Sequence, residues 1–454
     1  MLEKLFKLKD NKTNVKTEII AGVTTFMTMA YILAVNPSIL SAAGMDANAV
    51  LIATALASFV GTLCMALFSN YPFALAPGMG LNAYFAYTVV LGMGYSWQIA
   101  LLAVFAEGII FIILSLTNVR EAIFNAIPMT LKSAVSVGIG LFVAFIGLQD
   151  AKLIVKSDAT LITYQTFKGE LFSSVGVGAI LALIGVIITA ILLVKKVKGG
   201  ILLGIFATWI LGIIAELCGI YVPNADAGMY STIPSAFISF DLSSFGLTFG
   251  QVFKADFASI DWLNFIVVMF AFLFVDIFDT LGTLIGVSSK ADFLDKDGKL
   301  PKIKGALFAD AIATTLGAIF GTSTTTTYVE SASGVTAGGR TGLTAIVTGL
   351  LFLLSMFFSP LFLTIPSFAI APALITVGFY MMGSVVKINF EDMSEAIPAF
   401  LTILFMPLAY SISEGIAVGV ISYTLINLVC GKFKKLTPLM YILTVLFICK
   451  YIFL

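Results

Sequence analysis

Two aspartates lie where almost every neighbouring residue is apolar. Asp276 and Asp279 occur in FVDIFDTLGTLIG, and their i, i+3 spacing places both on one face of a helix. Acids at membrane depth are costly and mark functional sites. Each is therefore a candidate for ligand binding or proton exchange. One of the two could contact the ligand while the other orients it, and the spacing does not say which.

A third acid follows a run of four threonines. The segment GTSTTTTYVESASG (321–334) contains Glu330 directly after Tyr328 and Val329. Consecutive threonines favour extended backbone over helix. We therefore expect a short strand that includes Thr327, followed by a half-helix whose first turn carries Glu330.

The first half of the chain contains a comparable interruption. ALAPGMGLNAYFAY (74–87) breaks an apolar run with proline and glycine. It contains Asn82, which offers a donor and an acceptor together. It also contains Tyr84 and Phe85, whose rings could stack on a flat ligand. Aromatic residues make up 13% of the chain, so the alternative is that these two rings face lipid or pack in the core.

These residue types suit a neutral, planar ligand with N–H groups. The chain has no histidine, so a proton-coupled mechanism would use carboxylates, and Glu330, Asp279 and Asp276 are the candidates. Neither Lys nor Arg falls at the predicted midplane, which disfavours an anionic substrate. The four cysteines lack ligand spacing and are interpreted as packing residues; they are Cys64, Cys218, Cys430 and Cys449. We predict neither a metal site nor a cofactor.

The composition places these residues in a lipid bilayer. The 454 residues are 59% hydrophobic and 11% charged, with mean hydropathy +1.07, whereas soluble domains have about 45–50% apolar and about 25% charged residues. The sequence therefore predicts an all-α polytopic membrane protein. Basic residues are few and scattered, which argues against nucleic acid as a partner.

Fourteen transmembrane segments are predicted from the apolar runs. They cover residues 17–36, 48–68, 72–91, 97–116, 131–148, 174–194, 200–220, 262–287, 304–320, 323–338, 342–363, 370–386, 397–411 and 414–430. The interrupted segments are the third and the tenth. A last apolar piece, 437–454, could lie along the membrane surface or insert.

The positive charges test this topology. With a cytoplasmic N-terminus, twenty Lys and Arg residues fall in inner segments and four fall in outer loops, namely Lys152, Lys156, Lys168 and Lys254. This bias follows the positive-inside rule. We expect a multi-pass protein of the plasma (inner) membrane with both termini in the cytoplasm.

Three matches, in the same order, relate the two halves of the chain. TALASFVGTL (54–63) matches DAIATTLGAI (310–319), IPMTLKSAVSVG matches IPSFAIAPALITVG, and GGILLGIFATW matches EGIAVGVISYT. A repeat of seven spans is odd, so the second copy is inverted. Inverted repeats are typical of secondary transporters, whose site lies at interrupted helices near the midplane. The two extended pieces would pair with each other, because unpaired amides in lipid cost several kcal/mol each.

The motifs FDTLGTLIGV, GTSTTTTYVESASGVTAGGRTGLTA and APGMGLNAYFAYTVV resemble the AzgA-like branch of the nucleobase–cation symporters. These are permeases for hypoxanthine, guanine or adenine, and the resemblance runs from about Thr17 to Lys432. It implies a uracil-permease-like fold of two inverted seven-span repeats with short strands in spans three and ten. It also implies that Asp279 and Glu330 hold the base, with Thr283 where the uracil branch has a histidine.

The resemblance divides the chain into domains. A core, substrate-binding domain comprises 17–116 and 262–363, and a gate domain comprises 131–220 and 370–430. Residues 1–16 form a cytoplasmic N-terminus, 221–261 an extracellular loop, and 431–454 a C-terminal amphipathic or membrane-associated segment. A homodimer through the gate domains is a further implication.

The sequence thus predicts a transporter that imports a purine base with a proton, by an elevator-type movement of core against gate. Glu330 and Asp279 would accept hydrogen bonds from ring N–H groups, Tyr328 and Phe85 or Tyr84 would stack, and Asn82 would order its half-helix or bond the ligand. The alternatives are an anion transporter of the same fold, an intramembrane enzyme using paired carboxylates, and a channel. Sodium is an alternative coupling ion, and the preferred purine is left open.

Overall fold

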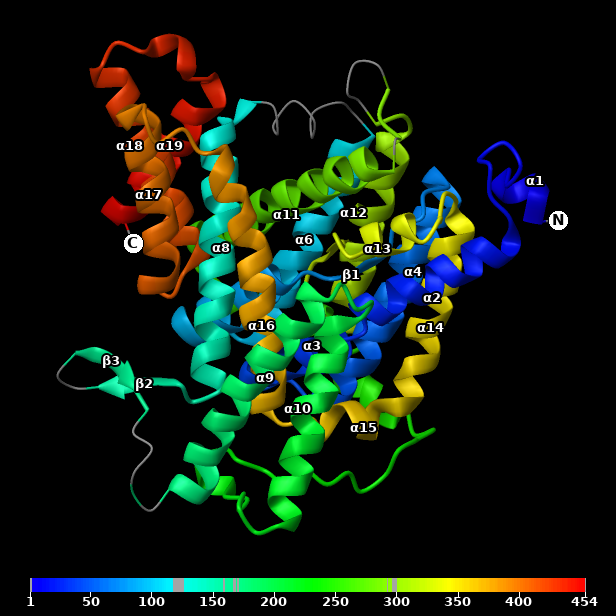
Figure 1. Cartoon of the computed structure of the whole chain (residues 1–454). Coiled ribbons are helices and arrows are strands. Elements are labelled where there is room, and N and C mark those ends of the chain that lie inside the picture. The colour runs from blue at the N-terminus through cyan, green and yellow to red at the C-terminus, as the bar shows by residue number, and fades with distance from the viewer. Residues whose placement is uncertain are drawn as a thin grey trace.

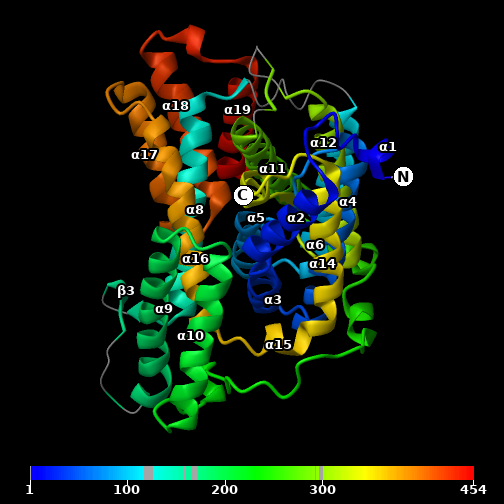
Figure 2. The ribbon, with the colours of Figure 1, turned by 45° about the vertical axis from the view of Figure 1, so that its right-hand side comes forward.

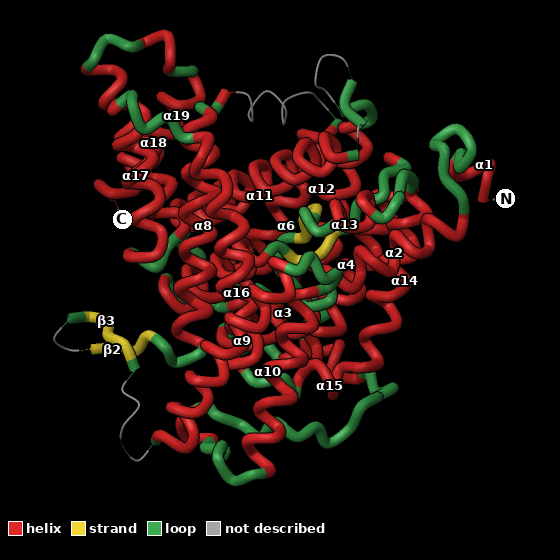
Figure 3. The backbone as a smooth tube through the Cα atoms, in the orientation of Figure 1, coloured by secondary structure: helices red, strands yellow, loops and turns green. Residues whose placement is uncertain are grey.

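The computed structural model describes residues 2–116, 126–157, 160–165, 169, 171–291, 293–295 and 300–453. Helices dominate this part of the chain, and its strands are short (Figures 1 and 3). Four basic residues that entered the prediction of orientation lie outside the described residues: Arg120, Lys168, Lys296 and Lys299.

Eleven helical segments of the described chain are long and apolar enough to cross a membrane. They are built from α2 (Val15–Met29) with α3 (Ile32–Ala42), α4 (Ala47–Ser69), α6 (Trp97–Ser115), α8 (Met129–Asp150), α9 (Val177–Val194), α10 (Gly200–Leu217), α11 (Trp262–Lys290), α12 (Ile303–Phe320), α14 (Gly342–Ser355) with α15 (Ser359–Leu363), α16 (Ser367–Met382) and α18 (Ile412–Val429). The predicted spans three, ten and thirteen are not among them. The first two are interrupted, and α17 (Met393–Leu408) has 16 residues.

The two interrupted segments each consist of a strand and a half-helix. In the first, β1 (Leu75–Pro77) leads into α5 (Met79–Ala83) and the π-helix Tyr84–Gly92. In the second, β4 (Thr325–Thr327) precedes α13 (Ser331–Thr336).

The strands β1 and β4 pair with each other. They are antiparallel, with Ala76 opposite Thr326, and the N–H groups of Gly78 and Tyr328 extend the pairing to the carbonyls of Thr324 and Ala74. A backbone buried at membrane depth needs such partners, because there is no water to supply them.

The helices pack in two groups. Contacts are dense among α2, α4, α6, α12 and α14, and separately among α8, α9, α10, α16, α17 and α18. Figure 2 shows these groups on opposite sides of the molecule. The long helix α11 touches both, since it contacts α6 and β4 in the first group and α8 and α18 in the second.

Two features were not predicted from the sequence, and the disposition of the C-terminal piece was left open. Span one is divided at Ala30 and Tyr31, between α2 and α3. A hairpin of β2 (Ile154–Ser157) and β3 (Leu161–Tyr164) lies in the predicted loop after span five. The C-terminal piece forms α19 (Pro438–Phe453), which packs on α18, where Thr444 donates to Thr424 over 2.8 Å.

Candidate functional site

The paired strands bring two of the predicted acids together. Glu330 directly precedes α13, and Asp279 lies on α11, which contacts β4. The Oδ2 atom of Asp279 lies 3.5 Å from the position that a Cβ would occupy on Gly78, between β1 and α5. Both side chains are partly accessible to solvent.

Asp276 has a different environment from Asp279, although it lies one turn away. It is fully buried, and its Oδ1 atom is 2.9 Å from the hydroxyl of Thr280. The same hydroxyl is 2.9 Å from Asp310 Oδ1 and 2.8 Å from the hydroxyl of Thr326. This cluster joins α11, α12 and β4 beneath the accessible carboxylates.

Of the three residues before Glu330, two are buried and contact the first interrupted segment, and one is exposed. Thr327 is buried in β4 opposite Leu75. Tyr328 is buried and its hydroxyl donates to the carbonyl of Pro77, so it ties the second interrupted segment to the first. Val329 is 51% exposed and is the most open of the predicted site residues.

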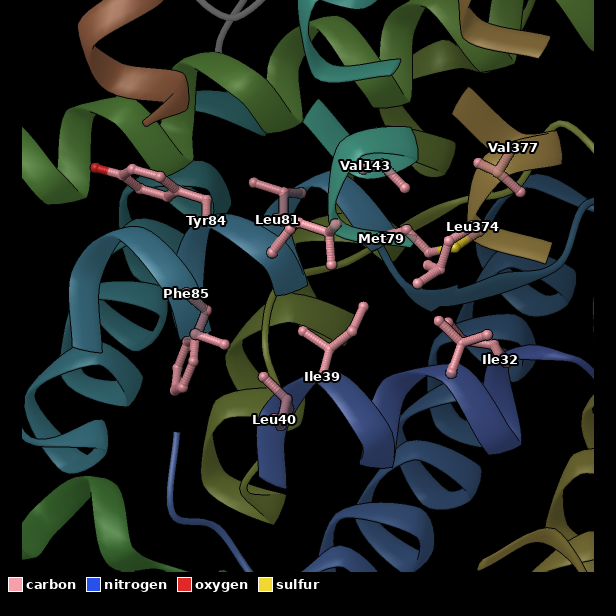
Figure 4. Packing of buried hydrophobic residues seen from close by; sticks show 14 of the residues in the cluster. Ile32, Ile39, Leu40, Met79, Leu81, Tyr84, Phe85, Val143, Leu374 and Val377 are labelled. Carbon is pink, nitrogen blue, oxygen red and sulfur yellow. The ribbon is translucent and has the colours of Figure 1, made fainter. Parts of the chain in front are cut away.

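The predicted residues of the first interrupted segment are buried. The Oδ1 atom of Asn82 accepts a hydrogen bond from the hydroxyl of Ser323, just before β4. The rings of Tyr84 and Phe85 meet Phe272 of α11 edge-on, with centroids 4.7 Å and 6.5 Å away. Both rings turn away from Met79 (Figure 4). The structure therefore buries both rings against α11, whereas Tyr328 lies two residues before Glu330.

Thr283 lies on α11 one turn after Asp279 and is partly accessible. It shares the helix with both aspartates. A side chain at this position can reach a ligand that Asp279 holds, because positions i and i+4 are neighbours on a helix surface.

Tyr31 was not among the predicted site residues. It lies at the division between α2 and α3, is fully buried, and donates a hydrogen bond of 2.6 Å to Glu330 Oε1. The sequence signal was the cluster of hydroxyl-bearing and aromatic residues in TTFMTMAYI (24–32). That signal marks the segment without selecting the residue.

Glu107 also contacts the interrupted segments. Its Oε2 atom accepts a hydrogen bond of 2.8 Å from the hydroxyl of Thr324, next to β4. This contact of the acid is with the residue next to the strand rather than with the accessible carboxylates.

An apolar seam separates the half-helix α5 from the second helix group. Met79 and Leu81 of α5 lie beside Val143 of α8 and Leu374 of α16 (Figure 4). Within the described residues, no group of three or more acids or cysteines could hold a metal ion.

The comparisons with known proteins agree on the family. A family model described as "Permease family", for xanthine and uracil permeases, matches residues 16–418. The chain belongs to the xanthine/uracil permease family. This permease is 46% identical to the guanine/hypoxanthine permease PbuO of Bacillus subtilis over 447 residues, which cover 98% of each chain. It is 42% identical to the adenine permease AdeP of Escherichia coli over 453 residues, covering 100% of this chain and 96% of the relative.

Solved structures support the fold. The permease resembles the transmembrane domain of BicA, a cyanobacterial bicarbonate transporter, with a TM-score of 0.64 and 18% identity over 90% of this chain and 97% of that one. A TM-score of 0.57 relates it to the anion transporter Slc26a9 in its inward-facing state, with 12% identity over 91% of this chain and 68% of that one. The permease is thus a mostly helical, multi-pass membrane transporter, and its family is one of transporters rather than enzymes.

Proposed function

We propose that this permease imports purine nucleobases, namely hypoxanthine, guanine and/or adenine. The observation that carries the proposal is that Asp279 and Glu330 both lie beside the paired strands and both remain partly accessible. Carboxylates accept hydrogen bonds and cannot donate them when ionised, so this pair suits a ligand that presents N–H groups. The names of PbuO and AdeP support a purine.

The contacts proposed for Asp279, Glu330, Thr283 and Val329 follow from accessibility, and the contact of Tyr328 follows from its place two residues before Glu330. Asp279 and Glu330 accept hydrogen bonds from ring N–H groups, and Tyr328 offers its ring to the face of the base. Thr283 and Val329 line the open side. Asp276 acts from below through Thr280, and Asn82 orders the half-helix α5 through Ser323. Tyr84 and Phe85 pack against Phe272 of α11, next to the C-terminal end of that half-helix.

The proposed topology is fourteen spans in two inverted repeats, with both termini cytoplasmic. The core comprises 17–116 and 262–363, and the gate comprises 131–220 and 370–430. The two groups of densely packed helices support this division. Movement of the core past the gate along the apolar seam would expose the acids to each side in turn, with proton symport carried by Glu330, Asp279 or Asp276.

An anion transporter of the same fold is the second candidate, because BicA and Slc26a9 share the fold. The predicted site residues speak against it, since they include three acids and no Lys or Arg. An anion would meet repulsion at Asp279 and Glu330.

Uptake into proteoliposomes tests the proposal. Labelled hypoxanthine, guanine and adenine should each be compared with labelled bicarbonate, with and without an inward proton gradient. We expect saturable purine uptake that the gradient stimulates. Glu330→Gln and Asp279→Asn should each lower it by about tenfold or more, since hydrogen bonds to charged groups are worth about 1.5–3 kcal/mol. Normal purine uptake by both variants would refute the site, and bicarbonate uptake alone would favour the second candidate.

A further inference from the structure

We propose that Tyr31 is a positioning residue for substrate binding, which fixes the carboxylate of Glu330 so that Oε2 is presented to the base. This inference rests on the proposed function. Its starting point is one contact between the two halves of the chain, the 2.6 Å hydrogen bond from the Tyr31 hydroxyl to Glu330 Oε1.

The contact uses only part of what Glu330 can accept. A carboxylate has two oxygens and about four lone-pair positions. A donor on Oε1 fixes the rotation of the group and leaves Oε2 for a ligand. Glu330 is partly accessible while Tyr31 is fully buried, so the tyrosine approaches from the protein side and the ligand can approach from the open side.

The position of Tyr31 is itself fixed by the face of α2 that continues into it. Thr25 lies against α13, because a Cβ on Gly334 would come within 2.0 Å of its Oγ1 atom. Thr28 reaches the backbone carbonyl of Glu330 over 3.5 Å. Positions 18, 21, 25, 28 and 31 follow the i+3 and i+4 spacing of one helix face.

The same face is anchored at its other end. Glu18 accepts hydrogen bonds from the backbone N–H groups of Arg340, Thr341 and Thr344. Two glycines let the backbones approach, since Gly334 and Gly339 both lie against Ala21. One face of α2 is therefore packed along its length, from the start of α14 to Glu330. Tyr31 follows directly on this packed face and does not lie in a loop.

Tyr31 lies where span one is divided into two helices. α2 ends at Met29 and α3 begins at Ile32, so Tyr31 lies at the junction of two helices. At this junction its hydroxyl reaches Glu330 Oε1 from the protein side. The Tyr31 hydroxyl thus donates a hydrogen bond at a predicted site whose acids accept hydrogen bonds.

The test compares Tyr31→Phe with a matched control. Tyr423 is also buried and its hydroxyl also donates to a glutamate, Glu395 Oε1, over 3.0 Å, but it lies on α18 in the other helix group. Tyr31→Phe should weaken hypoxanthine binding by about tenfold to a hundredfold in a scintillation proximity assay on purified protein. Tyr423→Phe should leave binding unchanged. Equal weakening by both variants, or none by Tyr31→Phe, would overturn the inference.

A double-mutant cycle separates positioning from general damage. In a Glu330→Gln background, adding Tyr31→Phe should change the affinity by less than about threefold, because residues that act through one contact are not additive. Full additivity would overturn the inference. If Tyr31→Phe does not reach the membrane, difluorotyrosine can be placed at position 31, because it keeps the ring and makes the hydroxyl a stronger donor. An unchanged affinity for hypoxanthine would then contradict the inference.

The wild-type protein separates this inference from the proposed function. Absence of purine binding by the wild type would refute the proposed function. Purine binding by the wild type together with an unaffected Tyr31→Phe variant would refute the role of Tyr31 alone.

Discussion

The carboxylate of Glu18 accepts a hydrogen bond of 2.6 Å from the hydroxyl of Thr344, which is 326 positions later in the chain. The same carboxylate accepts from the hydroxyl of Thr341 and from three backbone N–H groups at the start of α14. Glu18 is fully buried. One acid on α2 thus satisfies donors that a helix N-terminus would otherwise leave unpaired in the core.

Replacing Glu18 by glutamine should destabilise the protein. Five donors now converge on the Glu18 carboxylate, and the amide of glutamine would place two more donors there. At least one buried N–H therefore loses its acceptor, at a cost of about 1–3 kcal/mol. We expect a lower thermal unfolding temperature of the purified protein. Glu391→Gln, at an exposed acid, should not lower it, and a similar loss in that control would contradict the role of Glu18.

Two threonines one turn apart on α11 should respond differently to valine. Thr280→Val removes the hydroxyl shared by Asp276, Asp310 and Thr326, and leaving these buried groups without it should cost about 1–3 kcal/mol of stability. Thr283→Val should leave stability unchanged and alter purine affinity. Thermal unfolding and ligand binding on the same preparations measure both. Loss of stability in the Thr283 variant would contradict the prediction that only the buried threonine, Thr280, contributes to stability.

A methyl group on Gly80 should slow transport without abolishing binding. Its Cβ would lie 2.5 Å from Ile139 Cγ2 on α8, at the seam between the two helix groups. Gly80→Ala should reduce the maximal uptake rate more than it changes affinity. Adding Ile139→Ala removes the obstructing methyl and should restore much of the rate. A failure of this rescue would mean that the contact does not limit movement.

The acid Asp392, which caps α17, should stabilise the protein over most of the pH range. Lys435, Ser394 and Lys432 hold the pKa of Asp392 well below its ordinary value, and the ion pairs measure 2.8 Å and 3.0 Å. A depressed pKa in the folded state gives stability that is present above the unfolded pKa, about 3.9, and is lost as pH falls toward the folded pKa. Asp392→Asn should therefore lower the unfolding temperature by a constant amount from pH 8 to about pH 5. The difference should shrink below about pH 4, whereas a difference that grows there would contradict the assignment.

Local composition predicted where the helices are interrupted. Threonine runs favour extended backbone, and proline with glycine breaks an apolar helix, so the sequence pointed to 321–334 and 74–87. The structure has β4 and β1 in these segments. The acids were found in the same way, because charge is rare in apolar runs.

Contacts between distant elements were beyond sequence reasoning. Asp276 and Asp279 are alike in type and spacing, and only the packing of α12 and β4 on one of them makes their environments differ. Tyr31 is one of 14 tyrosines, and its partner is 299 positions away. Likewise, span one is divided at Ala30 and Tyr31, and neither residue is a proline or glycine that would have indicated a break.

The pairing of β1 with β4 constrains how the protein is made. The hydroxyl of Tyr328 and the carbonyl of Pro77, which join the two segments, are 251 positions apart. Chains grow at about 5–20 residues per second. The time between the synthesis of β1 and that of β4 is therefore roughly ten seconds or more. During that interval the backbone groups of β1 lack the partners that β4 supplies, and an unpaired amide in lipid costs several kcal/mol. A chain that ends before β4 should be recognised as defective by membrane proteases, and co-expression of the missing half should protect it.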